Sequence, residues 1–236
     1  MLSNKFKVNY SVGAVANGVK TDTFTFFLLF FYSNIIGLNP GLAGSAIFIA
    51  LCIDAITDPL MGTISDRTNS SFGRRHPYMF ISFIPMSLGY ILLFAPRQEW
   101  DMSQTDLFIW MTIFTVITRI GMTLFDIPHR AFGGEVTKDY KERTILMSWR
   151  EMFAWVAGLS NAFLGYGVFF ASTPEFPQGQ LNPDVWFPFA LTGAAIMVFS
   201  VLYSSLSTKD EINSLSKWSG AISLKDIFNE LKIAIG

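Results

Sequence analysis

Residues 42–64 read LAGSAIFIALCIDAITDPLMGTI, an almost uninterrupted apolar run whose only charged residues are Asp54 and Asp58. A hydrocarbon core of about 30 Å takes about 20 helical residues to cross, and backbone amides in lipid have to be satisfied within the helix itself. The run is therefore long enough to cross a bilayer as an α-helix, and it decides the fold class.

Similar apolar stretches occur along the rest of the chain, at residues 12–36, 78–94, 107–127, 145–170 and 186–206. The chain of 236 residues is 51% hydrophobic and only 15% charged, which is too apolar for an ordinary soluble domain. We predict an all-α membrane protein with a six-transmembrane-helix bundle over residues 1–206. Residues 207–236 are predicted to form a cytoplasmic linker with an amphipathic helix, because apolar residues recur there at helical spacing.

The loops between these stretches alternate in basic character. Lysines and arginines gather in the first tail, around residues 67–75, around residues 138–143 and after residue 206, whereas the opposite loops contribute only Arg97. Basic residues in short loops stay on the cytoplasmic side. We therefore expect an inner or plasma membrane protein whose two termini both face the cytoplasm.

Charge and cysteine content exclude several classes of function. The formal net charge of -1 offers no basic field for nucleic acid, and Cys52 is the only cysteine, so no internal disulfide can form. No cofactor and no resident metal are expected.

Several charged residues lie inside the predicted spans, where a charge costs at least roughly 2.5 to 3.5 kcal/mol on insertion scales. Asp54 and Asp58 are four residues apart and share a helix face, and Thr123 and Asp126, three apart, add further oxygens. These oxygens indicate a cage for Na⁺ or a site for a proton. A simpler interpretation is that Arg119 and the other buried charges only neutralise one another.

Two prolines follow these aspartates closely. Pro59 and Pro128 favour local helix breaks that would expose backbone carbonyls.

The loop after residue 61 carries the order G-x-x-x-D-R and then G-R-R-x-P. An acidic residue at the end of one helix can form charge-assisted contacts with arginines at the start of the next, which would lock the cytoplasmic side. We predict such a gating loop from Gly62, Asp66, Arg67, Gly73, Arg74 and Arg75.

Residues 54–77 and 126–144 resemble the glycoside-pentoside-hexuronide:cation symporters, of which melibiose permease is the familiar member, and the similarity runs from about residue 10 to residue 206. The resemblance implies the N-terminal half of a major facilitator superfamily fold, which has twelve helices in two six-helix bundles. It also implies alternating access and sugar transport driven by Na⁺, Li⁺ or H⁺. Partners would be the lipid bilayer, a small-molecule solute and a second six-helix half, supplied by the same gene, a second copy or another chain. We expect the sequence to be truncated.

The resemblance also assigns individual residues. The cation would be bound by Asp54, Thr57, Asp58, Thr123 and Asp126. The solute would be bound by Asn17, Asp22, Asp126, Arg130 and Arg150, with Glu151 as an alternative to Arg150.

The departures from melibiose permease concern the solute. Gly18 stands where that protein has an aspartate for galactoside hydroxyls, and Arg130 replaces the tryptophan that packs on the sugar ring. Because guanidinium groups bind carboxylates bidentately, Arg130 and Arg150 would suit a uronide-like solute better than a galactoside. Alternatively, Arg130 only pairs with Asp126.

The expected function is thus cation-coupled symport of a sugar, glycoside or uronide-like solute. The pattern also resembles sodium-coupled lysophospholipid symporters, although the 24 phenylalanines are expected to spread over lipid-facing positions. A non-transporting membrane scaffold is a third possibility. An intramembrane protease is not expected, because such an enzyme needs its two aspartates on separate helices, whereas Asp54 and Asp58 share one.

Overall fold

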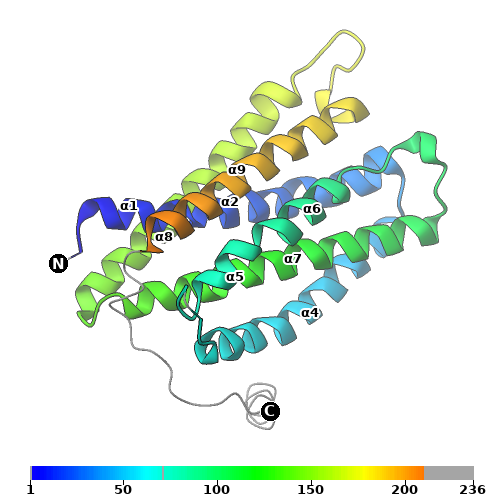
Figure 1. Cartoon of the computed structure of the whole chain (residues 1–236). Helices are drawn as coiled ribbons and strands as arrows, with labels where there is room; N and C mark the ends of the chain where they lie inside the picture. Colours follow the sequence, from blue (N-terminus) through cyan, green and yellow to red (C-terminus); the bar gives the residue numbers. More distant parts are fainter. Residues whose placement is uncertain (1, 71, 210–236) are drawn as a thin grey trace.

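The computed structural model describes residues 2–70 and 72–209. Every regular element in this part of the chain is helical (Figure 1). The predicted amphipathic helix after residue 209 lies outside the described residues.

Five helical segments are long and apolar enough to cross a membrane, which agrees with five of the predicted spans. The first two are α4 (Pro40–Arg67) and the pair α5 (His76–Ile81) and α6 (Phe83–Leu93). The next is α7 (Gln104–Glu135), followed by α8 (Tyr140–Leu164), which continues into the π-helix η4 (Gly165–Phe169). The last joins the 3₁₀ turn η6 (Pro183–Val185) to α9 (Trp186–Ser207). Two more 3₁₀ turns, η3 (Gln98–Trp100) and η5 (Gly179–Leu181), lie in the loops.

The first predicted span, residues 12–36, is a segmented helical run instead of one continuous α-helix. The helical run begins before that span and consists of α1 (Asn4–Val12), α2 (Ala14–Asp22), the π-helix η1 (Thr23–Phe27), the short α3 (Leu28–Phe30) and a second π-helix, η2 (Phe31–Ile36). A Cβ atom on Gly13, between α1 and α2, would lie 2.7 Å from the Phe125 ring of α7. The first interruption thus falls where the run passes close to α7.

The expected helix breaks at Pro59 and Pro128 are wrong. Both prolines lie inside helices that continue past them, in α4 and α7. A proline removes one backbone hydrogen-bond donor from its helix. Here α4 and α7 pack against each other over much of their length, and this packing stabilises both helices despite the missing hydrogen bond.

The helices form one bundle with a definite order of neighbours. In that order α4 packs on α7, α7 on α6 and α6 on α9, while α2 contacts both α8 and α9 (Figure 1). As a result α4 and α8 lie at the margins of the bundle, and both are poorly buried within it.

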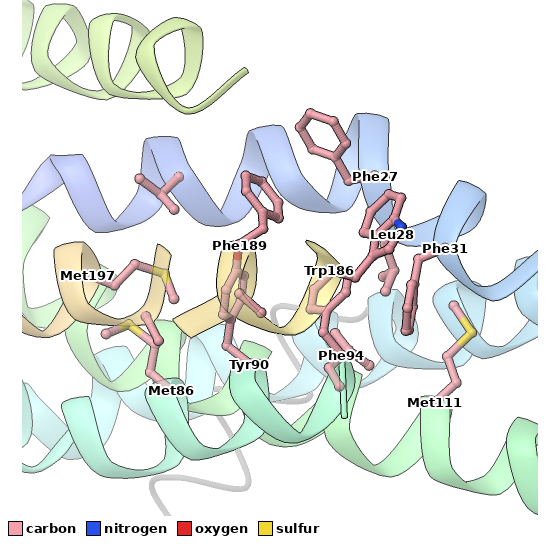
Figure 2. Close-up of a cluster of buried hydrophobic side chains, with 14 of the residues drawn as sticks. Phe27, Leu28, Phe31, Met86, Tyr90, Phe94, Met111, Trp186, Phe189 and Met197 are labelled. Carbon is pink, nitrogen blue, oxygen red and sulfur yellow. The ribbon is translucent and has the colours of Figure 1, made fainter. Parts of the chain in front are cut away.

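Aromatic side chains fill the core between α3, α6 and α9 (Figure 2). Trp186 is fully buried and lies parallel to Phe94, with ring centroids 6.2 Å apart, while Phe27, Phe31 and Phe170 surround it. The expectation that phenylalanines spread over lipid-facing positions is therefore wrong for these four, although others, such as Phe163, are exposed.

Candidate functional site

A small polar pocket of about 70 Å³ lies where α2, α4 and α7 meet. Its lining residues are Asn17, Lys20, Asp54, Asp58, Arg119, Met122, Thr123, Asp126 and Ile127. We call it the polar pocket. Four of the five predicted cation ligands line it, and Thr57 does not. The i, i+4 spacing on α4 and the i, i+3 spacing on α7 thus bring their oxygens to one place.

Asp58 is held in the polar pocket by a hydroxyl group. Thr123 Oγ1 donates a hydrogen bond of 2.7 Å to Asp58 Oδ1, which joins α7 to α4. One turn earlier, Asp54 pairs with Arg119, while Asp54 Oδ1 and the Thr57 hydroxyl are buried without a hydrogen-bond partner in the described part of the chain. Buried oxygens without donors are costly, and they leave lone pairs for a positive ligand.

Asp126 is bound by two arginines from different helices. Arg130 Nε donates to Asp126 Oδ2 at 2.7 Å, and Arg150 of α8 reaches Asp126 Oδ1. Arg150 is fully buried and also pairs with Glu151, whose side chain is half exposed. Arg150, rather than Glu151, is therefore the α8 residue that meets Asp126.

The simpler interpretation, mutual neutralisation, describes the structure in part. Asp54 and Asp126 are both in ion pairs with arginines, but their side chains keep 21% and 15% of their surface exposed. Among the described residues Asp58 makes no ion pair and neither does Lys20. The two residues are opposite charges lining one pocket.

A second cavity, which we call the α2/α8 groove, has a volume of about 360 Å³. Its lining residues are Asn17, Gly18, Thr21, Asp22, Thr25, Phe26, Glu151, Ala154, Trp155, Gly158 and Leu159. Asn17 lines both this groove and the polar pocket, so it joins the two cavities.

Asp22 belongs to this groove and is absent from the polar pocket. It is buried, and its Oδ2 accepts a hydrogen bond of 2.7 Å from Asn161 Nδ2 of α8. The same amide group lies 3.2 Å from Thr23 Oγ1, which is hydrogen-bonded to Tyr90 of α6. Among the predicted solute residues, Asp22 is thus separated from Asp126, Arg130 and Arg150.

A larger and almost wholly apolar groove of about 540 Å³ lies between α2, α8 and α9. It is lined by Val15, Val19, Met152, Phe153, Val156, Ala157, Ser160, Asn161, Leu164 and Ile196. We call it the apolar groove. The sequence analysis did not predict this groove, because its apolar residues follow the same pattern as ordinary lipid-facing residues.

The predicted gating loop forms ion pairs that include one residue the sequence analysis missed. Arg75 pairs with Asp66 at 2.7 Å, as expected, and also with Glu135 at the end of α7, at 2.7 Å. Arg74 pairs with the same Glu135 oxygen at 2.8 Å. Gly73 between the helices has φ +77°, a backbone conformation that favours glycine.

The other two gating-loop residues are placed on α4. Gly62 faces Ile127 of α7 with room for a Cβ atom at 3.8 Å, and Arg67 ends α4. Close helix approach therefore does not depend on Gly62.

Four residues of these sites were not predicted. Lys20 and Arg119 are charges within the predicted spans, so their position was a usable signal. Glu135 falls in the 126–144 segment beside the loop. Asn161 is a single amide in an apolar helix, and no motif marks it.

The comparisons with known proteins agree with this architecture. Residues 9–224 match the family described as MFS/sugar transport protein. The inner membrane symporter YicJ of Escherichia coli is 31% identical over 164 residues, which are 70% of this chain and 35% of that protein. The putative glycoside/cation symporter YagG, also of Escherichia coli, is 31% identical over 67% of this chain and 34% of its own length.

A vertebrate relative is also similar. The sodium-dependent lysophosphatidylcholine symporter 1-A of Danio rerio is 29% identical over 71% of this chain and 31% of its own length. The chain spans less than half the length of each of these curated relatives. The helices, the intramembrane charges and the match over residues 9–224 lead to one conclusion: the chain is an integral membrane protein and belongs to the MFS/sugar transport protein family.

Proposed function

We propose that this chain forms the ion-binding half of a cation-coupled secondary symporter, which moves a sugar, glycoside or uronide-like solute by alternating access. The observation that carries the proposal is the setting of Asp58. Its carboxylate lies within an apolar helix, faces two further carboxylates in the polar pocket, and has a threonine hydroxyl as its hydrogen-bond partner. A carboxylate in this setting attracts a small cation.

The coupling ion would be Na⁺ or H⁺. Asp54 Oδ1, both oxygens of Asp58, and the Thr123 hydroxyl are the groups that could receive Na⁺, since hard cations prefer oxygen ligands. A proton would instead bind Asp58 alone. In either case the added positive charge lowers the repulsion among the carboxylates on α4 and α7.

The solute would bind beside Asp126, because Asp126 is both a predicted cation ligand and a predicted solute ligand. Arg130 is 49% exposed and pairs with Asp126 through Nε, so its terminal nitrogens remain free to receive a carboxylate of the solute. Asn17 lies between the polar pocket and the α2/α8 groove, where it could contact both ion and solute. Asp22 could reach solute only from the groove.

The orientation and the second half of the transporter are part of the proposal. The basic loops favour a cytoplasmic position for both termini, and the ion pairs of Asp66, Arg74 and Arg75 would then lie on that side. We propose that this gating loop holds the cytoplasmic side closed in one state and that a second six-helix bundle completes the solute cavity.

Uptake into cells or proteoliposomes that contain the full-length protein tests the proposal. Uptake of a labelled glycoside or hexuronide should rise with an inward Na⁺ or proton gradient. Asp58→Asn should abolish this dependence, whereas Asp184→Asn in the loop before α9 should not change it. If Asp58→Asn left solute binding as strongly stimulated by the cation as before, the coupling scheme would be wrong.

Lysolipid transport is a second candidate. The apolar groove of about 540 Å³ could hold an acyl chain, and one relative is named a lysophosphatidylcholine symporter. Val156→Trp would narrow this groove. It should reduce uptake of a lysolipid and leave uptake of a hexuronide unchanged, and the opposite pattern would exclude lipid cargo.

A further inference from the structure

Most of the charged side chains in and around the polar pocket are joined in ion pairs, and two of the charges in the pocket are not. The ion pairs join Asp54 to Arg119, Asp126 to Arg130 and Arg150, and Arg150 to Glu151. These pairs contain three carboxylates and three guanidinium groups. The formal charges that remain in the pocket are the carboxylate of Asp58 and the ammonium group of Lys20, and in the part of the chain described here neither is in an ion pair.

The ammonium group of Lys20 lies near the face of an aromatic ring. Its ammonium nitrogen lies 6.0 Å from the centroid of the Phe24 ring, one turn along the same run. The guanidinium group of Arg119 lies 5.6 Å from that centroid. A lysine side chain has four flexible methylene groups, so its ammonium can move between the face of Phe24 and the carboxylates of the polar pocket.

We propose that Lys20 is a tethered competitor of the coupling ion. This inference rests on the proposed function, because it assigns a role in the same ion site. Without an ion, the ammonium group is the countercharge of Asp58. When an ion reaches Asp58, the two positive charges repel one another and Lys20 moves toward Phe24 and the solute side of Asn17.

This arrangement links the ion to the solute. With an ion on Asp58, Lys20 becomes the surplus positive charge of the pocket, and an anionic group of the solute can balance it. Ion binding would then favour binding of an anionic solute, and the solute would favour the ion, as linkage requires. Lys20 would be a specificity-determining residue in addition to the arginines of Asp126.

Cation-dependent thermal stability of the purified full-length protein in detergent tests the inference without any solute. The unfolding temperature is measured against NaCl, with choline chloride to hold ionic strength constant, and against pH in the absence of Na⁺. Lys20→Met removes the competitor, so half of the cation-induced stabilisation should occur at a concentration of Na⁺ or H⁺ at least about tenfold lower than in wild type. Lys20→Arg, which keeps the charge, and Lys141→Met, on the exposed start of α8, should stay near the wild-type concentration.

A charge-pair experiment provides a second readout that needs no ion binding. Asp58→Asn and Lys20→Met each leave one unbalanced charge in the pocket. The double variant leaves none, so its loss of unfolding temperature should be smaller than the sum of the two single losses. An unchanged or higher cation concentration in Lys20→Met, or additive losses in the double variant, would overturn the inference.

The two proposals fail in different ways. If neither Na⁺ nor protons stabilise the wild-type protein, the ion site itself is wrong. If the wild type responds to a cation and Lys20→Met responds at the same concentration, the ion site stands and the role of Lys20 is wrong.

Discussion

Gly18 of α2 lies directly against the backbone of Ala154 in α8: a Cβ atom on Gly18 would be 2.1 Å from the Ala154 carbonyl oxygen. Gly158, one turn further along α8, faces the Gly18 carbonyl oxygen at 3.4 Å from its own ideal Cβ position. Small residues thus let the two helices cross at close range. The position where melibiose permease has an aspartate therefore has no room for a side chain in this chain.

We predict that Gly18→Asp does not restore galactoside binding and instead destabilises the bundle. The new side chain would have to displace the α8 backbone, and overpacking of this kind costs about 1 to 3 kcal/mol or more. The unfolding temperature in detergent should fall, and Gly18→Ala should lower it too. Gly44→Ala on α4 is the matched control, since no described atom beyond the adjoining backbone of its own helix lies within 4 Å of its added Cβ atom. An unchanged unfolding temperature for Gly18→Ala would contradict the close crossing.

Thr123→Val should weaken cation binding without unfolding the protein. The variant keeps the shape of the side chain and removes the hydroxyl that donates to Asp58 at 2.7 Å. The Thr123 hydroxyl oxygen is also a proposed Na⁺ ligand, and loss of such a contact with a charged group costs about 1.5 to 3 kcal/mol, which corresponds to at least a tenfold rise in the Na⁺ concentration that gives half-maximal uptake.

Thr112→Val on the same helix is its control, because within residues 2–70 and 72–209 the Thr112 hydroxyl bonds only to the backbone of Phe108 in α7. Equal cation dependence of the two variants would remove Thr123 from the proposed ion site.

The sequence predicted those features that depend on spacing along one helix. Apolar runs of sufficient length correctly indicated α4 and α7, and the intervals between Asp54 and Asp58 and between Thr123 and Asp126 correctly placed their side chains at one pocket. These predictions succeed because side chains three or four residues apart share a helix face whatever the neighbours are.

Features that depend on contacts between distant segments were not predicted. The first helical run is interrupted at Gly13, where Phe125 comes close, and neither residue reveals the other in the sequence. Asn161 is likewise unmarked until Asp22, 139 positions away, is found beside it. The break predicted at Pro59 is wrong because the rule that proline interrupts a helix considers that helix alone. Packing between α4 and α7 keeps the helix continuous past Pro59.

Glu135→Gln should loosen the gating loop. The carboxylate receives hydrogen bonds from Arg74 at 2.8 Å and from Arg75 at 2.7 Å, so its neutralisation weakens two charge-assisted contacts at once. Hydrogen–deuterium exchange of peptides that cover residues 64–78 should become faster, by a factor of about ten or more if about 1.5 kcal/mol of local stability is lost.

Glu99→Gln, in the exposed turn η3 of another loop, tests whether neutralising any loop carboxylate has this effect, and it should leave exchange at residues 64–78 unchanged. Exchange at wild-type rates in Glu135→Gln would show that Glu135 does not hold the loop.

Asp22 and Asn161 should respond differently to substitution. Asp22→Asn keeps an oxygen that can accept from Asn161 Nδ2. It also adds an amide group that can donate to Asn161 Oδ1, which is buried and has no partner among the described residues. The variant should therefore keep or raise the unfolding temperature. Asn161→Leu removes the donor and leaves the buried Asp22 carboxylate without it, which should destabilise the protein by about 1 to 3 kcal/mol. If Asp22 binds solute, Asp22→Asn lowers uptake although the protein stays folded; normal uptake by a stable Asp22→Asn protein would leave the carboxylate a structural role only.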